Sequence, residues 1–145
     1  MKNVGPRSNV LKASEKLRSG LEAAGSKQRC PCAHVLFRED GNCKGVYLVC
    51  RGKVRMSVRN LPKLNRDFGA GSLLGLPSTF TGHPYSLTAV TLADSEIVHV
   101  PRKQFLDLMR ERPDLCREAT DMLGREVTFI QSALAQRCRQ LAAVL

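Results

Sequence analysis

Residues 68–76, which read Phe-Gly-Ala-Gly-Ser-Leu-Leu-Gly-Leu, decide the fold: a glycine-rich turn leads into a short apolar strand that ends at another glycine. Gly71 falls at a turn where a positive φ is expected, and Gly41 and Gly52 fall at similar turns. Short apolar runs bounded by turn residues recur along the chain, at residues 35–37, 45–50, 54–58, 73–76, 85–92 and 97–100. Many short strands at such spacing predict an antiparallel sandwich or roll.

Helical periodicity replaces this pattern at both ends of the chain. Residues 1–26 predict an amphipathic helix, because their apolar residues recur near helical spacing. Pro101 begins a short helix over residues 102–110, and Pro113 begins a long helix over residues 114–145. At about 1.5 Å per residue, the long helix extends roughly 45 Å.

The long helix carries an apolar stripe that a small roll cannot cover over its whole length. The stripe advances by threes and fours through Leu123, Val127, Ile130, Leu134, Cys138 and Leu141. We predict that it packs on a second copy of the chain, which makes it a candidate homodimer interface. Gly124, inside this helix, either permits the close approach of two helix backbones or is a tolerated surface glycine.

Length and composition predict one soluble domain. The chain has 145 residues, of which 43% are apolar and 25% charged. We divide it into a helical segment over residues 1–28, a β-roll with its short helix over residues 29–110, and the dimerisation helix over residues 113–145. No stretch is long and apolar enough to cross a bilayer, and no apolar signal core follows the first residues. The sequence therefore predicts a cytoplasmic protein without membrane association.

The positive charge is concentrated in the first half of the chain. Residues 1–66 contain 15 Lys and Arg against 4 Asp and Glu, whereas residues 67–145 contain 8 against 9. A basic half can attract nucleic acid, and such binding would depend steeply on salt. However, the chain has no tryptophan to serve as a stacking platform. We therefore interpret these charges as a solvated surface, with direct nucleic-acid binding as an alternative.

The order of strands, glycines and terminal helix resembles the cyclic-nucleotide-binding β-roll of the Crp/Fnr family of transcription regulators. The resemblance covers roughly residues 30–145. It implies a mainly β (α+β) fold: an antiparallel jelly-roll β-roll with an N-terminal helix and a long C-terminal dimerisation helix. It also implies a sensor function, and it places Gly75 where the backbone approaches a ligand closely.

The two residues that hold the ligand in this family are absent. In members that bind cyclic nucleotide, a glutamate accepts from the ribose hydroxyl and an arginine pairs with the cyclic phosphate. By resemblance, Leu76 stands at the glutamate position and Ser86 at the arginine position. We therefore expect a degenerate pocket, with no cofactor and with cyclic nucleotide not favoured. The candidate pocket residues are Leu74, Gly75, Leu76, Ser86, Leu87, Thr88, Thr128, Ile130 and Gln131.

The cysteines suggest a rival function, a thiol-, redox- or metal-responsive regulator. Cys30 and Cys32 would share a face of an extended strand, Cys43 lies in a turn, and nearby Lys and Arg residues would lower a thiol pKa. Cys50 and Cys116 are interpreted as small buried apolar residues. No Ser/His/Asp, paired-carboxylate or phosphate-loop arrangement is present, so we do not expect an enzyme.

Family members continue past the long helix into a winged helix-turn-helix, for which this sequence leaves no room. We therefore expect no direct DNA binding. Two interpretations stay open. The chain is either the sensor domain of a longer regulator, or a single-domain protein that forms homodimers or heterodimers with full-length family members.

Overall fold

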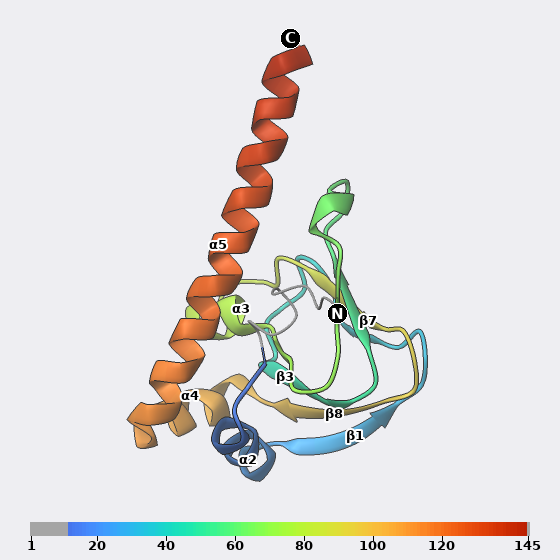
Figure 1. Cartoon of the computed structure of the whole chain (residues 1–145). Helices are drawn as coiled ribbons and strands as arrows, with labels where there is room; N and C mark the ends of the chain where they lie inside the picture. The colour runs from blue at the N-terminus through green and yellow to red at the C-terminus, as the bar shows by residue number, and fades with distance from the viewer. Residues whose placement is uncertain (1–11, 145) are drawn as a thin grey trace, which may run out of the picture.

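The computed structural model describes residues 12–144, apart from the side chains at positions 130, 133, 134, 136, 137, 140, 141 and 144. Two four-stranded antiparallel sheets form its β-roll (Figure 1). The first sheet has the order β1-β8-β3-β6, with β1 over Ser26–Cys30, β8 over Ser95–Val100, β3 over Val46–Arg51 and β6 over Leu73–Leu74. The second has the order β2-β7-β4-β5, with β2 over Val35–Phe37, β7 over Thr88–Thr91, β4 over Val54–Ser57 and β5 over Arg66–Phe68. The predicted jelly-roll fold class is confirmed.

The central strands of the first sheet, β3 and β8, are covered on both faces. Successive side chains of a strand point to opposite faces, so Ile97 and Val98 in β8 enter two different apolar clusters. Ile97 packs between the two sheets with Val49 and Val54, whereas Val98 packs under the helices with Leu17 and other core residues. Burial of both faces explains why β3 is a continuous apolar run rather than an alternating one.

The helices cover the outer face of the first sheet (Figure 1). They are α2 over Glu15–Ala24, α3 over Leu76–Thr81, α4 over Arg102–Glu111 and α5 over Pro113–Val144, with a short 3₁₀ turn, η1, over Pro62–Leu64. The first part of α5 packs on α4 and α2, and the rest extends away from the roll towards the C-terminus (Figure 1). The short and long C-terminal helices are therefore where the prolines predicted them.

The strand predicted over residues 85–92 covers only Thr88–Thr91. Three other predicted boundaries were also wrong. The N-terminal helix covers only Glu15–Ala24, because the Ser14 hydroxyl accepts from the Leu17 amide and caps it there; residues 1–11 lie outside the described part. The boundary predicted at residue 28 falls inside β1, which pairs with β8 along its whole length. The strand predicted over residues 73–76 ends at Leu74, since Gly75 turns the chain into α3.

Positive φ angles confirm two of the three predicted glycine turns, Gly52 at 103° and Gly71 at 92°. At the third turn the prediction of Gly41 was wrong, because Asp40 adopts the positive φ, at 69°. Aspartate tolerates this conformation better than most residues.

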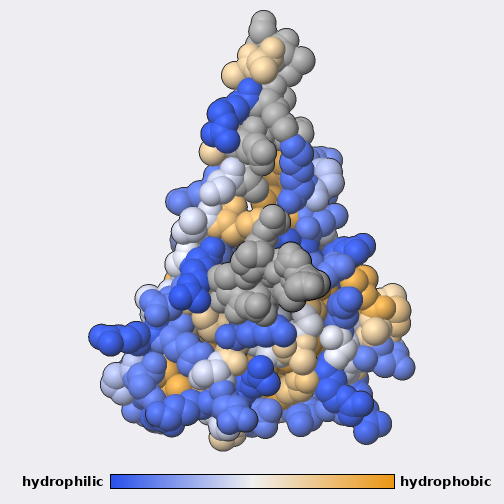
Figure 2. Space-filling model, in the orientation of Figure 1, coloured by the Kyte–Doolittle hydropathy of each residue, from blue (hydrophilic) through white to orange (hydrophobic). Residues whose placement is uncertain are grey.

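The surface seen in Figure 2 is mainly hydrophilic, with apolar residues in small separate areas. Among the helices described, none combines the length and the apolar character that crossing a membrane requires.

Candidate functional site

Gly75 lies at the start of α3, where the resemblance places the ligand. Its φ of 87° confirms that the position needs glycine. A side-chain carbon added there would lie 3.1 Å from the Gly45 carbonyl oxygen and 3.2 Å from the Tyr85 ring. The close approach predicted at Gly75 therefore exists, but its neighbours belong to the protein itself.

Tyr85 fills the space beside Gly75. Its ring stacks on Phe37, with ring centroids 4.0 Å apart. Its hydroxyl donates to the Gly45 carbonyl over 2.7 Å and accepts from the Lys44 amide over 2.9 Å. Burial raises the pKa of Tyr85, so the phenol keeps its proton. Tyr85 is thus a fixed part of the core at the point where a ligand would meet α3.

The Tyr85→Phe variant will be less stable than the wild type by about 1–3 kcal/mol, since it leaves the buried Gly45 carbonyl and the part-buried Lys44 amide without their partner. Urea unfolding of both proteins measures this difference. Ser86→Ala serves as the control. Ser86 is exposed, so removing its hydroxyl group is expected to change the free energy of unfolding by less than about 0.5 kcal/mol. Equal stability of Tyr85→Phe and wild type would contradict the assigned hydrogen bonds.

A second part of the site lies between α5 and the β4–η1–β5 hairpin. The Arg66 guanidinium carbon lies 3.9 Å from the centroid of the Phe129 ring and 4.9 Å from that of Phe68. Glu126, one helical turn before Phe129, is only 5% exposed. Burial raises the pKa of Glu126 to about 7, against the opposing effect of Arg66.

The space enclosed there is about 20 Å³. Its lining comprises Met56, Leu64, Arg66, Phe68, Leu87, Glu126 and Phe129. A single water needs about 10–15 Å³ of such volume, and small-molecule sites typically have about 300–1,000 Å³. The side chains therefore fill this space in the described conformation.

Of the predicted pocket residues, Leu87 lines this enclosed space. Leu74 and Leu76 are buried in the apolar clusters, and Ser86 is exposed. The Thr88 hydroxyl accepts from the Glu39 amide over 2.8 Å and lines an open groove of about 520 Å³ with mixed charges.

On α5, the predicted pocket residues Thr128 and Gln131 do not line the enclosed space. Thr128 and Gln131 are exposed, whereas Glu126 and Phe129 face the roll. One residue along a helix rotates the side chain by about 100°, so a small shift in alignment changes the face. The sequence signal for Glu126 and Phe129 is their spacing of four and three residues after the buried Met122, which places all three on one face of the helix. The side chain of Ile130 lies outside the described part.

The predicted dimer stripe is partly described. Leu123 is half-buried against the helical core, and Cys138 is exposed. Val127, which is 37% exposed, is the only exposed large apolar residue among the side chains described. The side chains of Ile130, Leu134 and Leu141 lie outside the described part.

The three cysteines of the rival hypothesis are free thiols that differ in burial. Cys30 is buried at the end of β1, and burial raises the pKa of its thiol, opposite to the expected lowering. Cys32 is exposed in the following turn, so the two do not share a strand face. The Cys43 sulfur lies 3.6 Å from the Thr79 hydroxyl. The described residues contain no group of three or more His, Cys, Asp or Glu suited to a metal.

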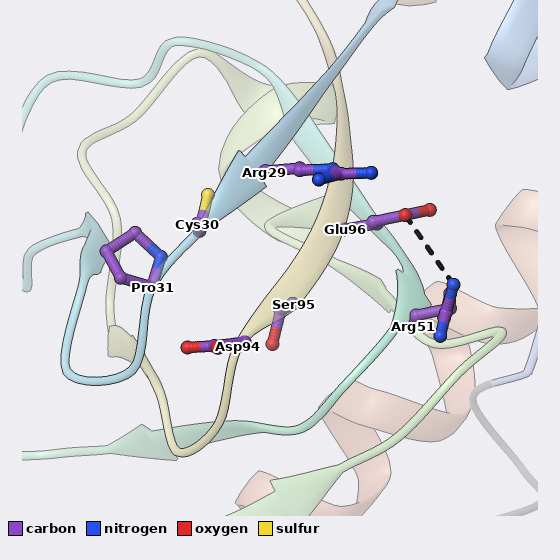
Figure 3. A pocket seen from close by; sticks show the side chains of 7 residues that line it. All are labelled: Arg29, Cys30, Pro31, Arg51, Asp94, Ser95 and Glu96. Carbon is purple, nitrogen blue, oxygen red and sulfur yellow. Dashed lines mark ion pairs between the residues drawn. The ribbon is translucent and has the colours of Figure 1, made fainter.

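Cys50 and Cys116 are half-buried against the helical core, rather than fully buried as expected. An open hollow of about 510 Å³ lies beside Cys30 (Figure 3). Arg51 pairs with Glu96 over 3.7 Å in this hollow, and Arg29 and Asp94 add one charge of each sign. Its mixed charges do not select a ligand of either sign.

Comparisons with known proteins identify the family and the fold. The family model described as "Cyclic nucleotide-binding domain" matches residues 27–112. The Catabolite Activator Protein of Thermus thermophilus is similar in structure, with a TM-score of 0.73 and 25% identity over 87% of this chain and 60% of that one. A transcriptional regulator from Thermotoga maritima gives a TM-score of 0.69 and 16% identity, over 81% of this chain and 94% of that one. The cAMP-bound PfPKA-R structure gives a TM-score of 0.68 and 17% identity, over 89% of this chain and 43% of that one.

Two curated relatives are much longer proteins. Patatin-like phospholipase domain-containing protein 7 of Mus musculus is 23% identical over 96 residues, which are 64% of this chain and 7% of that protein. Lysophospholipase nte1 of Neurospora crassa is 29% identical over 84 residues, 56% of this chain and 6% of that protein. Because the chain spans so little of either, their catalytic activity is not transferred to it.

Proposed function

Since the chain belongs to the cyclic nucleotide-binding domain family, we propose that it is a non-enzymatic regulatory domain of the Crp/Fnr type whose ligand space is occupied by its own side chains. The observation that carries this proposal is the filled site. Tyr85 occupies the space beside Gly75, and only about 20 Å³ remains between α5 and the hairpin.

The missing anchors support the same conclusion. Leaving one partner of a buried ion pair alone costs roughly 3–5 kcal/mol, which weakens binding about a hundredfold or more. At the two anchor positions, Leu76 is fully buried in the core and Ser86 is exposed. Neither residue offers a charge to a ribose or a cyclic phosphate.

Calorimetric titration of the reduced protein with cAMP tests this proposal. We expect no saturable heat up to millimolar cAMP, because the usual anchors are missing and the space is filled. The PfPKA-R fragment solved with cAMP bound is the positive control. Saturable micromolar binding to this chain would overturn the proposal, since backbone donors would then have to replace both anchors.

We further propose that the domain acts as a homodimer through α5, or as a heterodimer with full-length family members. Two observations support this: α5 extends well beyond the roll (Figure 1), and Val127 exposes an apolar side chain on it. No helix-turn-helix occurs among the elements described between residues 12 and 144. We propose that regulation passes through α5 to the partner, as a change in how the two long helices cross.

A further inference from the structure

Glu126 is the only charged residue that is buried among the side chains described. A buried carboxylate is costly unless it is paired, so its position on the roll-facing side of α5 needs an explanation. It lies directly where the helix meets the β4–η1–β5 hairpin, beside the small enclosed space of the candidate site.

Arg66 connects the same two elements. Its guanidinium group contacts Phe68 from its own strand, β5, and Phe129 from α5. A guanidinium over two aromatic faces is favourable on both sides, and more so when water is excluded. One side chain of the hairpin therefore holds the helix, one turn away from the buried carboxyl group.

We propose that Glu126, Arg66 and Phe129 form a latch that holds α5 against the β4–η1–β5 hairpin and that loosens when Glu126 ionises. The inference rests on the proposed function, because the latch occupies the space that a ligand would otherwise fill. It makes the position of α5, and hence any dimer built on α5, responsive to protons instead of to a nucleotide.

The surroundings of Glu126 set the direction of this response. Among the described side chains that line the space with it, only Arg66 from β5 is charged. β4, η1 and the segment before β7 present the apolar side chains of Met56, Leu64 and Leu87. The neutral carboxyl group is stable in this largely apolar lining. The carboxylate pays a desolvation cost there, which the nearby charge of Arg66 offsets only in part.

The pKa of Glu126 is raised from 4.5 to about 7, so the closed state holds the proton more tightly than an open state. Protonation of Glu126 therefore stabilises the closed state fully below about pH 4.5, and this stabilisation is lost as pH rises towards 7. By linkage, the opening equilibrium of the latch should rise about tenfold between pH 6 and pH 8.

Hydrogen–deuterium exchange of the full chain at pH 6 and pH 8, corrected for intrinsic exchange rates, tests the latch. In the wild type we expect amides of α5 around Glu126 and of β5 to be about tenfold less protected at pH 8. Glu126→Gln keeps the shape but cannot ionise, so its protection should be equal at both pH values. Glu111→Gln, which changes an exposed carboxyl at the end of α4, should behave as the wild type does.

An unchanged pH dependence in Glu126→Gln would overturn the latch, as would equal protection of the wild type at both pH values. The carboxyl carbon shift of Glu126 in the wild type provides a second test without any substitution. A titration midpoint near 7 is expected, and a midpoint near the ordinary 4.5 would overturn the proposal. Neither test uses a nucleotide, so failure of the latch is distinct from the cAMP binding that would overturn the proposed function.

Discussion

Replacing Leu76 by glutamate will destabilise the fold by about 4 kcal/mol or more, instead of restoring a carboxylate for a ribose hydroxyl. Leu76 is fully buried and packs in the helical core cluster with Leu73 and Phe105. Truncating a buried leucine already costs about 2–5 kcal/mol. An unpaired carboxylate in the same place adds a desolvation cost of several kcal/mol. The variant would therefore lose much of a typical total stability of about 5–15 kcal/mol.

Urea unfolding of Leu76→Glu and Leu76→Met measures this effect. Methionine has nearly the same volume and no charge, so Leu76→Met should lose less than about 1.5 kcal/mol. A stable Leu76→Glu protein that gains cAMP binding would contradict the assignment of Leu76 to the core. It would also show that the site opens far more easily than its packing indicates.

The strands found by sequence reasoning are those with a strong apolar signal. Val46–Arg51 is a nearly continuous apolar run because both faces of its sheet are covered. β1 has no such signal: its sequence is Ser-Lys-Gln-Arg-Cys, and only its last residue is buried. It is a strand because β8 pairs with it, and such a tertiary partner cannot be identified from local periodicity.

The candidate site divides in the same way. The loss of the two charged anchors could be inferred from single positions in the sequence. The side chains that fill the site could not be inferred in this way, because their contacts join distant parts of the chain. Tyr85 bonds Gly45, 40 residues away, and Arg66 in β5 contacts Phe129 in α5. Prediction from one sequence therefore identified what the site lacks better than what it contains.

Placing a glutamate at Val127 will separate the proposed dimer. Val127 lies on the predicted stripe and exposes 37% of its surface in the single chain, so a glutamate there can reach solvent in the monomer. In a two-fold symmetric interface each substitution occurs twice, and two carboxylates at related positions repel each other. Such a juxtaposition of like charges costs several kcal/mol, and a loss of only about 2 kcal/mol already raises the Kd about thirtyfold.

Sedimentation velocity over a concentration series measures this change. Ser132→Glu is the matched control: Ser132 is exposed on the same helix, and five residues turn its side chain by about 140° from Val127. It adds the same charge to α5 but should leave the dimer intact. If both variants weaken the dimer equally, net charge rather than the stripe is responsible. If the wild type sediments as a monomer throughout, α5 is not a dimer helix, and its extension beyond the roll requires a different partner.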